Sequence, residues 1–160
     1  MHPTTPPRAP WVWLVLGGLT AAAGCTTVDL GDNFVAPGVQ LDEDFFYCRV
    51  QPEVIGALRC ASGESDEAGS CHSARSALRL SADAETDPAP ACDADGKVTG
   101  TVPPSYMENL VALGFTVQAD ALASPLYRRP LGLDSHPRVI FEADSPEAEL
   151  VRTWIQGVTP

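Results

Sequence analysis

The spacing of apolar residues predicts a short amphipathic helix near the end of the chain. Ser145 is a typical N-cap residue, Pro146 suits the first helical position, and Gly157 is a typical helix end. Glu147 and Glu149 place negative charge at the positive end of the helix dipole. The expected apolar face consists of Leu150, Val151, Trp154 and Ile155. We therefore expect this helix to pack against the core.

A second apolar repeat predicts a helix over residues 49–59. It rests on three residues that recur every four positions, Val50, Val54 and Leu58. Pro52 fits the first turn, where its missing N–H group costs nothing, and the helix is expected to end near Cys60. An aromatic cluster at 45–47 precedes this helix and marks the expected start of the globular part. We expect four aromatic side chains in the core, Phe45, Phe46, Phe115 and Trp154.

Two further elements are shorter. Ser105 and Glu108 match a capping box at the start of a helix that ends near Leu113, and Gly114 is its expected stop. A turn or short helix follows over residues 124–129. Polar, Ala- and Pro-rich loops separate these elements, over 61–70 and 81–104. The pattern as a whole predicts an all-α, loop-rich fold.

Composition and net charge limit the number of domains and the classes of function that we expect. The 160 residues fit one domain, and 15 prolines with 13 glycines agree with short helices and long loops. The net charge of −11 would repel a phosphate backbone, so we expect no nucleic-acid partner. The chain has three histidines and no Gly-x-Ser-x-Gly motif, and we expect it not to be an enzyme.

The first residues look like an export signal. Residues 11–23 form an uncharged, mostly apolar run that is short for a membrane span, and small residues lead into Cys25. This pattern resembles a bacterial lipoprotein signal, in which the cysteine is lipidated. We expect a signal peptide over 1–24, a flexible tether over 25–44 and a domain over 45–160, anchored in the cell envelope at the outer membrane. The domain would face the periplasm or the cell surface. Ordinary secretory cleavage near Ala23 is the alternative.

Export would place the four remaining cysteines in an oxidising compartment. If all were disulfide-bonded, Cys48, Cys60, Cys71 and Cys92 could pair in three ways. Cys71 is followed directly by a histidine, and Cys60 lies upstream in the arrangement Cys-x10-Cys-His. Two cysteines followed by His are the usual attachment site of a covalent haem, normally at a shorter spacing. A plain Cys60–Cys71 disulfide and a zinc site that adds the two histidines remain alternatives.

The surrounding sequence favours haem. The first part of a family resemblance consists of Tyr47-Cys48-Arg49-Val50-Gln51-Pro52, Arg59-Cys60, Cys71-His72-Ser73 and Ala77-Leu78-Arg79-Leu80. The second part consists of Ser124-Pro125-Leu126-Tyr127-Arg128-Arg129-Pro130-Leu131-Gly132, His136, Val139-Ile140-Phe141 and Leu150 with Trp154-Ile155-Gln156-Gly157. Together, residues 45–157 resemble the c-type cytochrome domain of exported bacterial lipoproteins.

The resemblance implies a small cytochrome c-like domain of three to five short helices with one covalent haem c. Cys60 and Cys71 would form the thioether bonds, and His72 would be the proximal iron ligand. His136 matches the family's loop histidine and would be the sixth ligand, with Met107 as the alternative. The implied function is one-electron transfer with a redox partner protein that the sequence does not identify.

Haem at Cys60 and Cys71 would leave Cys48 and Cys92, for which a mutual disulfide is the simplest outcome. Ala68 stands where a cysteine would complete the short spacing, so a haem-free protein is the alternative. That protein would be a structural or binding lipoprotein on a degenerate cytochrome-like scaffold, with disulfides at 60–71 and 48–92.

Overall fold

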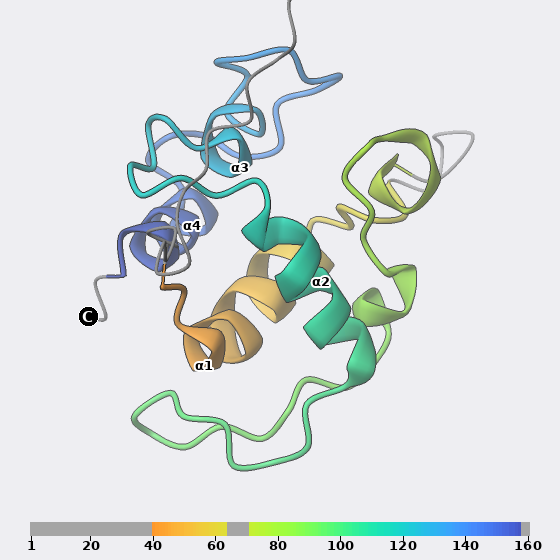
Figure 1. Cartoon of the computed structure of the whole chain (residues 1–160), viewed down its shortest axis with the longest axis vertical. Helices are drawn as coiled ribbons and strands as arrows, with labels where there is room; N and C mark the ends of the chain where they lie inside the picture. The colour runs from red at the N-terminus through yellow and green to blue at the C-terminus, as the bar shows by residue number, and fades with distance from the viewer. Residues whose placement is uncertain (1–39, 64–70, 158–160) are drawn as a thin grey trace, which may run out of the picture. The chain divides into compact units, whose positions relative to one another are not determined.

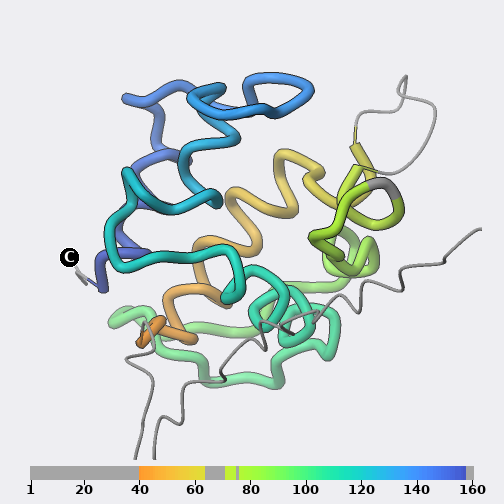
Figure 2. The backbone as a smooth tube through the Cα atoms, turned by 45° about the horizontal axis from the view of Figure 1, so that its top comes forward, coloured from red at the N-terminus to blue at the C-terminus, as the bar shows by residue number. Residues whose placement is uncertain are grey.

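The computed structural model describes residues 40–63 and 71–157, which belong to one compact unit, Pro37–Pro160 (Figure 1). The elements in chain order are α1 (Glu43–Phe45), η1 (Phe46–Gly56), η2 (Cys71–Arg75), η3 (Ala82–Glu85), α2 (Pro104–Gly114), α3 (Pro125–Arg128) and α4 (Pro146–Gln156). In this part of the chain the regular elements are helical, and the one extended pairing is an isolated bridge between Cys92 and Val98. The predicted all-α class is confirmed. Long irregular connections join the helices, as the tube in Figure 2 shows.

Several predicted features lie outside the described residues. These are the signal peptide, the lipidation site Cys25, the first part of the tether and the acidic loop over 64–70. Among the described residues, none of the helices combines the length and apolar character needed to cross a membrane.

The first helix begins earlier than expected. The carboxylate of Asp42 accepts the N–H of Phe45 at 2.9 Å and caps α1, which continues directly into the π-helix η1. Residues 43 and 44 are therefore helical rather than part of a tether. Pro52 lies inside η1 and not in a first turn, and the helix ends at Gly56, before Cys60. The sequence pattern missed this start because the cap and the buried pair Phe45 and Phe46 lie ahead of the aliphatic repeat.

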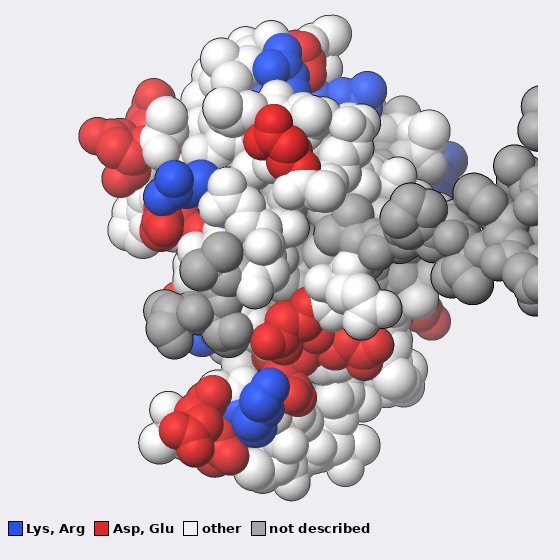
Figure 3. Space-filling view, turned by 60° about the vertical axis from the view of Figure 1, so that its left-hand side comes forward, with Lys and Arg blue, Asp and Glu red and all other residues white. Residues whose placement is uncertain are grey.

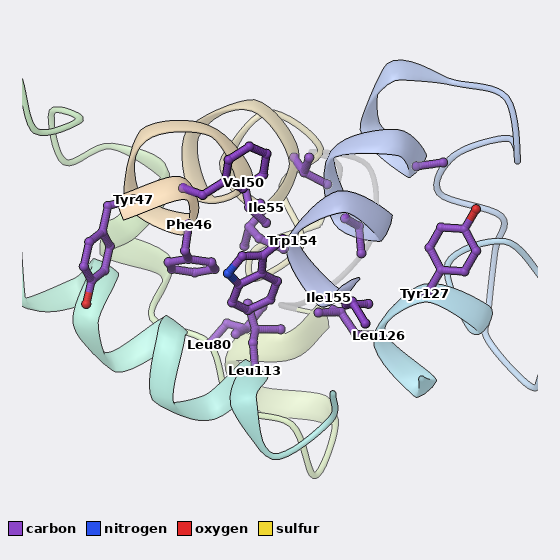
Figure 4. Close-up of a cluster of buried hydrophobic side chains, with 14 of the residues drawn as sticks. Phe46, Tyr47, Val50, Ile55, Leu80, Leu113, Leu126, Tyr127, Trp154 and Ile155 are labelled. Atoms are coloured by element: carbon purple, nitrogen blue, oxygen red, sulfur yellow. The ribbon is translucent and has the colours of Figure 1, made fainter. Parts of the chain in front are cut away.

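Helix α4 packs across η1 and closes the core (Figure 4). The rings of Phe46 and Trp154 have centroids 4.9 Å apart, and the indole N–H of Trp154 donates to the carbonyl of Asp42 at 2.9 Å. The predicted ends of α4 are confirmed. Ser145 accepts the N–H of Ala148 at 3.2 Å, and Gly157 ends the helix with a φ of 62°.

Two buried, hydrogen-bonded amide side chains, Gln51 and Asn109, join η1 to α2 and to η3 with its N-cap residue Ser81. Asn109 donates to the side-chain oxygen of Gln51 at 3.1 Å and accepts the N–H of Ser81 at 2.7 Å. Gln51 in turn donates to the carbonyl of Ala84 at 3.4 Å. Both amide side chains are buried, so each needs these partners.

The start and the end of α2 compare differently with the prediction. The helix ends at Gly114 as expected, but the capping box is wrong: Ser105 lies inside α2 and donates to the carboxylate of Asp87 at 2.6 Å. Phe115, just beyond the helix, is 86% exposed rather than in the core. The other three aromatic residues expected in the core are buried.

A disulfide between Cys48 and Cys92 joins η1 to the loop before α2. This is the pairing that haem attachment at the other two cysteines would leave. Asp44 adds to the same connection, since its carboxylate accepts the N–H of Val98 at 3.1 Å and pairs with Lys97 at 3.2 Å. The long middle loop is thus held to the first helix at two points.

Candidate haem site

Cys60 lies in the turn that follows η1. Its N–H donates to the carbonyl of Ile55 at 3.0 Å, and Arg59 takes the left-handed conformation with a φ of 50°. The carboxylate of Glu85 then accepts the N–H groups of Ala61 and Ser62, both at 2.9 Å. Glu85 has a side chain that is 8% exposed, and it fixes the backbone directly after Cys60.

The chain returns beside this turn at Cys71 and His72. The N–H of His72 donates to the carbonyl of Cys60 at 3.2 Å, and the N–H of Ser73 donates to the carbonyl of Ala61 at 3.0 Å. These two hydrogen bonds therefore hold the backbone after Cys60 next to the backbone after Cys71. Cys60 and Cys71 both carry thiol side chains.

The Cys60 thiol has an unusual environment. Its burial raises its pKa to about 12, and the nearby carboxylate of Glu85 and the neighbouring Cys71 act in the same direction. The positive charge of Arg138 opposes this shift. Cys60 is therefore protonated at neutral pH.

His72 has a defined hydrogen-bond partner on one side of its ring. Its Nδ1 lies 2.7 Å from the hydroxyl of Ser76, and that hydroxyl donates to the carbonyl of Leu78 at 2.6 Å. A serine hydroxyl has one proton, so Ser76 accepts from His72 and Nδ1 carries the hydrogen. The lone pair of the neutral ring is then on Nε2.

His136 also has a hydrogen-bond partner at Nδ1. Its Nδ1 lies 2.6 Å from the carbonyl oxygen of Arg138, which can only accept. The loop around His136 is fixed by an ion pair between Arg128 and Asp134, with N–O distances of 2.8 and 2.9 Å, and by the N–H of Ile140 on the carbonyl of Pro130 at 2.7 Å. The Nδ1 of His136 therefore carries a hydrogen and donates it to this carbonyl.

The structure brings these two histidines together. Their ring centroids are 6.1 Å apart, and the ring planes differ by 26°. Burial lowers the pKa of His72 below its usual 6.5, the neighbouring His136 lowers it further, and a hydrogen bond to the backbone of Leu78 opposes the shift. His72 is therefore neutral at physiological pH, which keeps its Nε2 lone pair available.

Two histidines and two cysteine thiols are the residue types that hold a haem c. Two imidazoles that bind one metal ion from opposite sides through nitrogens at about 2 Å have ring centres about 6 Å apart. A ligating histidine usually donates its other ring N–H to a carbonyl or a similar acceptor, as both do here. In residues 40–63 and 71–157, no group of three or more His, Cys, Asp and Glu side chains is arranged to hold a metal ion by itself. The zinc alternative thus gains no support from this part of the chain.

Three further residues named from the sequence, Met107, Arg128 and Arg129, lie outside the histidine pair. Met107, the alternative sixth ligand, is 45% exposed on α2, whereas His136 lies next to His72. Arg128 is held by Asp134, while Arg129 acts on His72 through its charge. On the face shown in Figure 3, acidic side chains form several patches with basic ones beside them, in keeping with the negative net charge.

Sequence reasoning missed two residues of this site. Ser76 follows His72 by four positions, a spacing at which a serine can reach a ring nitrogen, so it could have been found. Glu85 has no such signal, because its partners precede it by 23 and 24 positions.

A comparison of the chain with protein-family models, curated proteins and solved structures finds no match in any of the three.

Proposed function

We propose that this protein is a monohaem electron-transfer protein that holds one haem c through Cys60, Cys71, His72 and His136. The main support is the pair of near-parallel imidazoles with centroids 6.1 Å apart, each with its Nδ1 in a hydrogen bond to an oxygen acceptor. The two thiols beside this pair supply the second part of the set. The finer assignment, a cytochrome c-like fold, is part of the same proposal.

Each group has a distinct role. Cys60 and Cys71 would hold the haem through one thioether bond each, and the addition of a thiol to a vinyl group needs no oxidant. His72 and His136 would hold the iron through their ring nitrogens. When bound, haem supplies the one-electron iron couple, and the protein sets its potential through the axial ligands and the local polarity. Two imidazole ligands favour a lower potential than an imidazole with a thioether.

The proposal includes the location of the domain. Lipidation at Cys25 anchors the protein to a membrane of the cell envelope, and the domain exchanges electrons with a partner protein in the periplasm or at the cell surface. No catalytic turnover of a substrate is involved. Mass spectrometry of the purified N-terminal peptide tests the anchor, since a diacylglycerol-modified Cys25 supports it and an unmodified cysteine contradicts it.

The haem is tested by the absorption spectrum of the full chain co-expressed with a haem-attachment system. We expect a Soret band and the spectrum of a low-spin iron with two nitrogen ligands. His136→Ala should convert the iron to a high-spin form, whereas Met107→Ala, the matched control on α2, should leave the spectrum unchanged. A colourless protein with a Cys60–Cys71 disulfide would refute the proposal in favour of the haem-free lipoprotein.

A further inference from the structure

The loop that follows His72 closes on itself around Ser76. The N–H of Leu80 donates to the carbonyl of His72 at 3.1 Å, so the segment between them is a closed loop. Inside it, the hydroxyl of Ser76 lies 2.7 Å from Nδ1 of His72 and 2.6 Å from the carbonyl of Leu78. Ser76 thus links the ring of His72 to the backbone of the loop.

We propose that Ser76 is the positioning residue of the site: it fixes the tautomer and the orientation of the His72 ring so that Nε2 is the metal-binding atom. This inference rests on the proposed function. The inference goes beyond that function because it assigns control of the His72 ring to Ser76, a residue outside the four that are proposed to hold the haem.

The direction of each hydrogen bond supports this role. The Ser76 hydroxyl donates its one proton to the carbonyl of Leu78, which can only accept a hydrogen bond. Toward His72 the hydroxyl oxygen therefore acts as an acceptor, and the tautomer with the hydrogen on Nδ1 is favoured. An ordinary hydrogen bond shifts such an equilibrium by about fivefold.

The backbone of His72 is already held by other contacts. Its N–H is bonded to the carbonyl of Cys60, and its carbonyl is bonded to the N–H of Leu80. The remaining freedom is the rotation of the side chain, which the Ser76 hydroxyl restrains together with the backbone of Leu78. A group that accepts from the distal ring nitrogen also raises the basicity of the ligating one. Loss of the hydroxyl should therefore raise the midpoint potential of the bound iron.

The direct test is the protonation of the His72 ring nitrogens, measured by long-range proton–nitrogen NMR on the full chain without haem, above the pH range in which imidazoles titrate. In the wild-type chain we expect the hydrogen on Nδ1, and this measurement needs no variant. Ser76→Ala should reduce that preference by about fivefold, and Ser76→Thr should restore it. A wild-type His72 with its hydrogen on Nε2, or a Ser76→Ala ring identical to the wild type, overturns the role of Ser76.

Two controls separate this inference from the proposed function. Ser73→Ala keeps the backbone hydrogen bonds of that residue and should change neither ring. His136 is bonded to a backbone carbonyl and should keep its tautomer in every variant. In the haem-loaded chain, Ser76→Ala should raise the midpoint potential, and an unchanged potential overturns the role toward the metal. A chain that takes up no haem refutes the proposed function, while the ring measurement still decides whether Ser76 positions His72.

Discussion

Replacement of Glu85 by alanine tests how the turn that holds Cys60 is stabilised. The Glu85 carboxylate is nearly buried and accepts two backbone N–H groups at 2.9 Å, from Ala61 and Ser62, as well as the Ser62 hydroxyl. A hydrogen bond to a charged group contributes about 1.5–3 kcal/mol. Ala61 is fully buried, so its N–H would lose its partner without gaining water, whereas the N–H of Ser62 is partly accessible. We expect Glu85→Ala to lower the free energy of unfolding by about 3 kcal/mol.

The assay is urea unfolding followed by circular dichroism, with Glu53→Ala as the matched control. Glu53 is an exposed glutamate paired with Arg49 on one helix face, and its loss should cost less than about 0.5 kcal/mol. Glu85→Gln retains an acceptor oxygen but not the charge, and it should fall between the two. Alkylation of Cys60 should also become faster in Glu85→Ala, because the thiol would lose the fixed turn that buries it. If Glu85→Ala costs no more than Glu53→Ala, the assignment of the turn to this carboxylate is wrong.

Three further predictions concern the scaffold. Replacement of both Cys48 and Cys92 by serine should lower the free energy of unfolding by about 4 kcal/mol, because the bridge spans a sequence separation of 44; a loss below about 1 kcal/mol in a urea titration contradicts this. The carboxylate of Asp44 accepts the N–H of Val98, and this hydrogen bond together with Lys97 lowers the pKa of Asp44 below 3.8. The stabilisation from Asp44 is therefore complete above pH 3.8, and it is lost as the pH falls through the lower folded-state pKa. Asp44→Asn should flatten the pH dependence of unfolding in that acidic range, and an unchanged slope speaks against this role. Asn109→Ala should cost about 2–3 kcal/mol because its partners are buried, while Val111→Ala, at an exposed site on the same helix, should cost under about 0.5 kcal/mol; equal losses would count against the role of the buried amide pair Gln51 and Asn109.

Local signals predicted the helix ends well where the partners are adjacent in the chain. Ser145 and Gly157 bound α4 as expected, because an N-cap and a left-handed glycine act within one turn. Ser105 has a similar local signal, but it donates to Asp87, which lies 18 positions away. A competing tertiary partner of this kind leaves no trace in a short sequence window. Phe115 shows the same limit, since hydrophobicity alone does not place a side chain inside the core.

The residues of the candidate site likewise differ in whether a local sequence signal predicts them. Cys71 and His72 are adjacent in the sequence, and Cys60 is the nearest upstream cysteine, so these three could be selected directly. His136 is predicted as an iron ligand only by the family resemblance, because its closeness to His72 depends on the fold of a distant loop. Glu85 could not be found, because its role depends on where the chain returns.

Haem attachment is tested most sharply by the mass of the peptide that spans Cys60 to Cys71 in the mature protein, isolated without reduction after co-expression with a haem-attachment system. We expect this peptide to carry one haem through both cysteines, while Cys48 and Cys92 appear as a separate disulfide-linked pair. A peptide without haem and two hydrogens lighter, as a Cys60–Cys71 disulfide requires, would show that the protein is not a cytochrome.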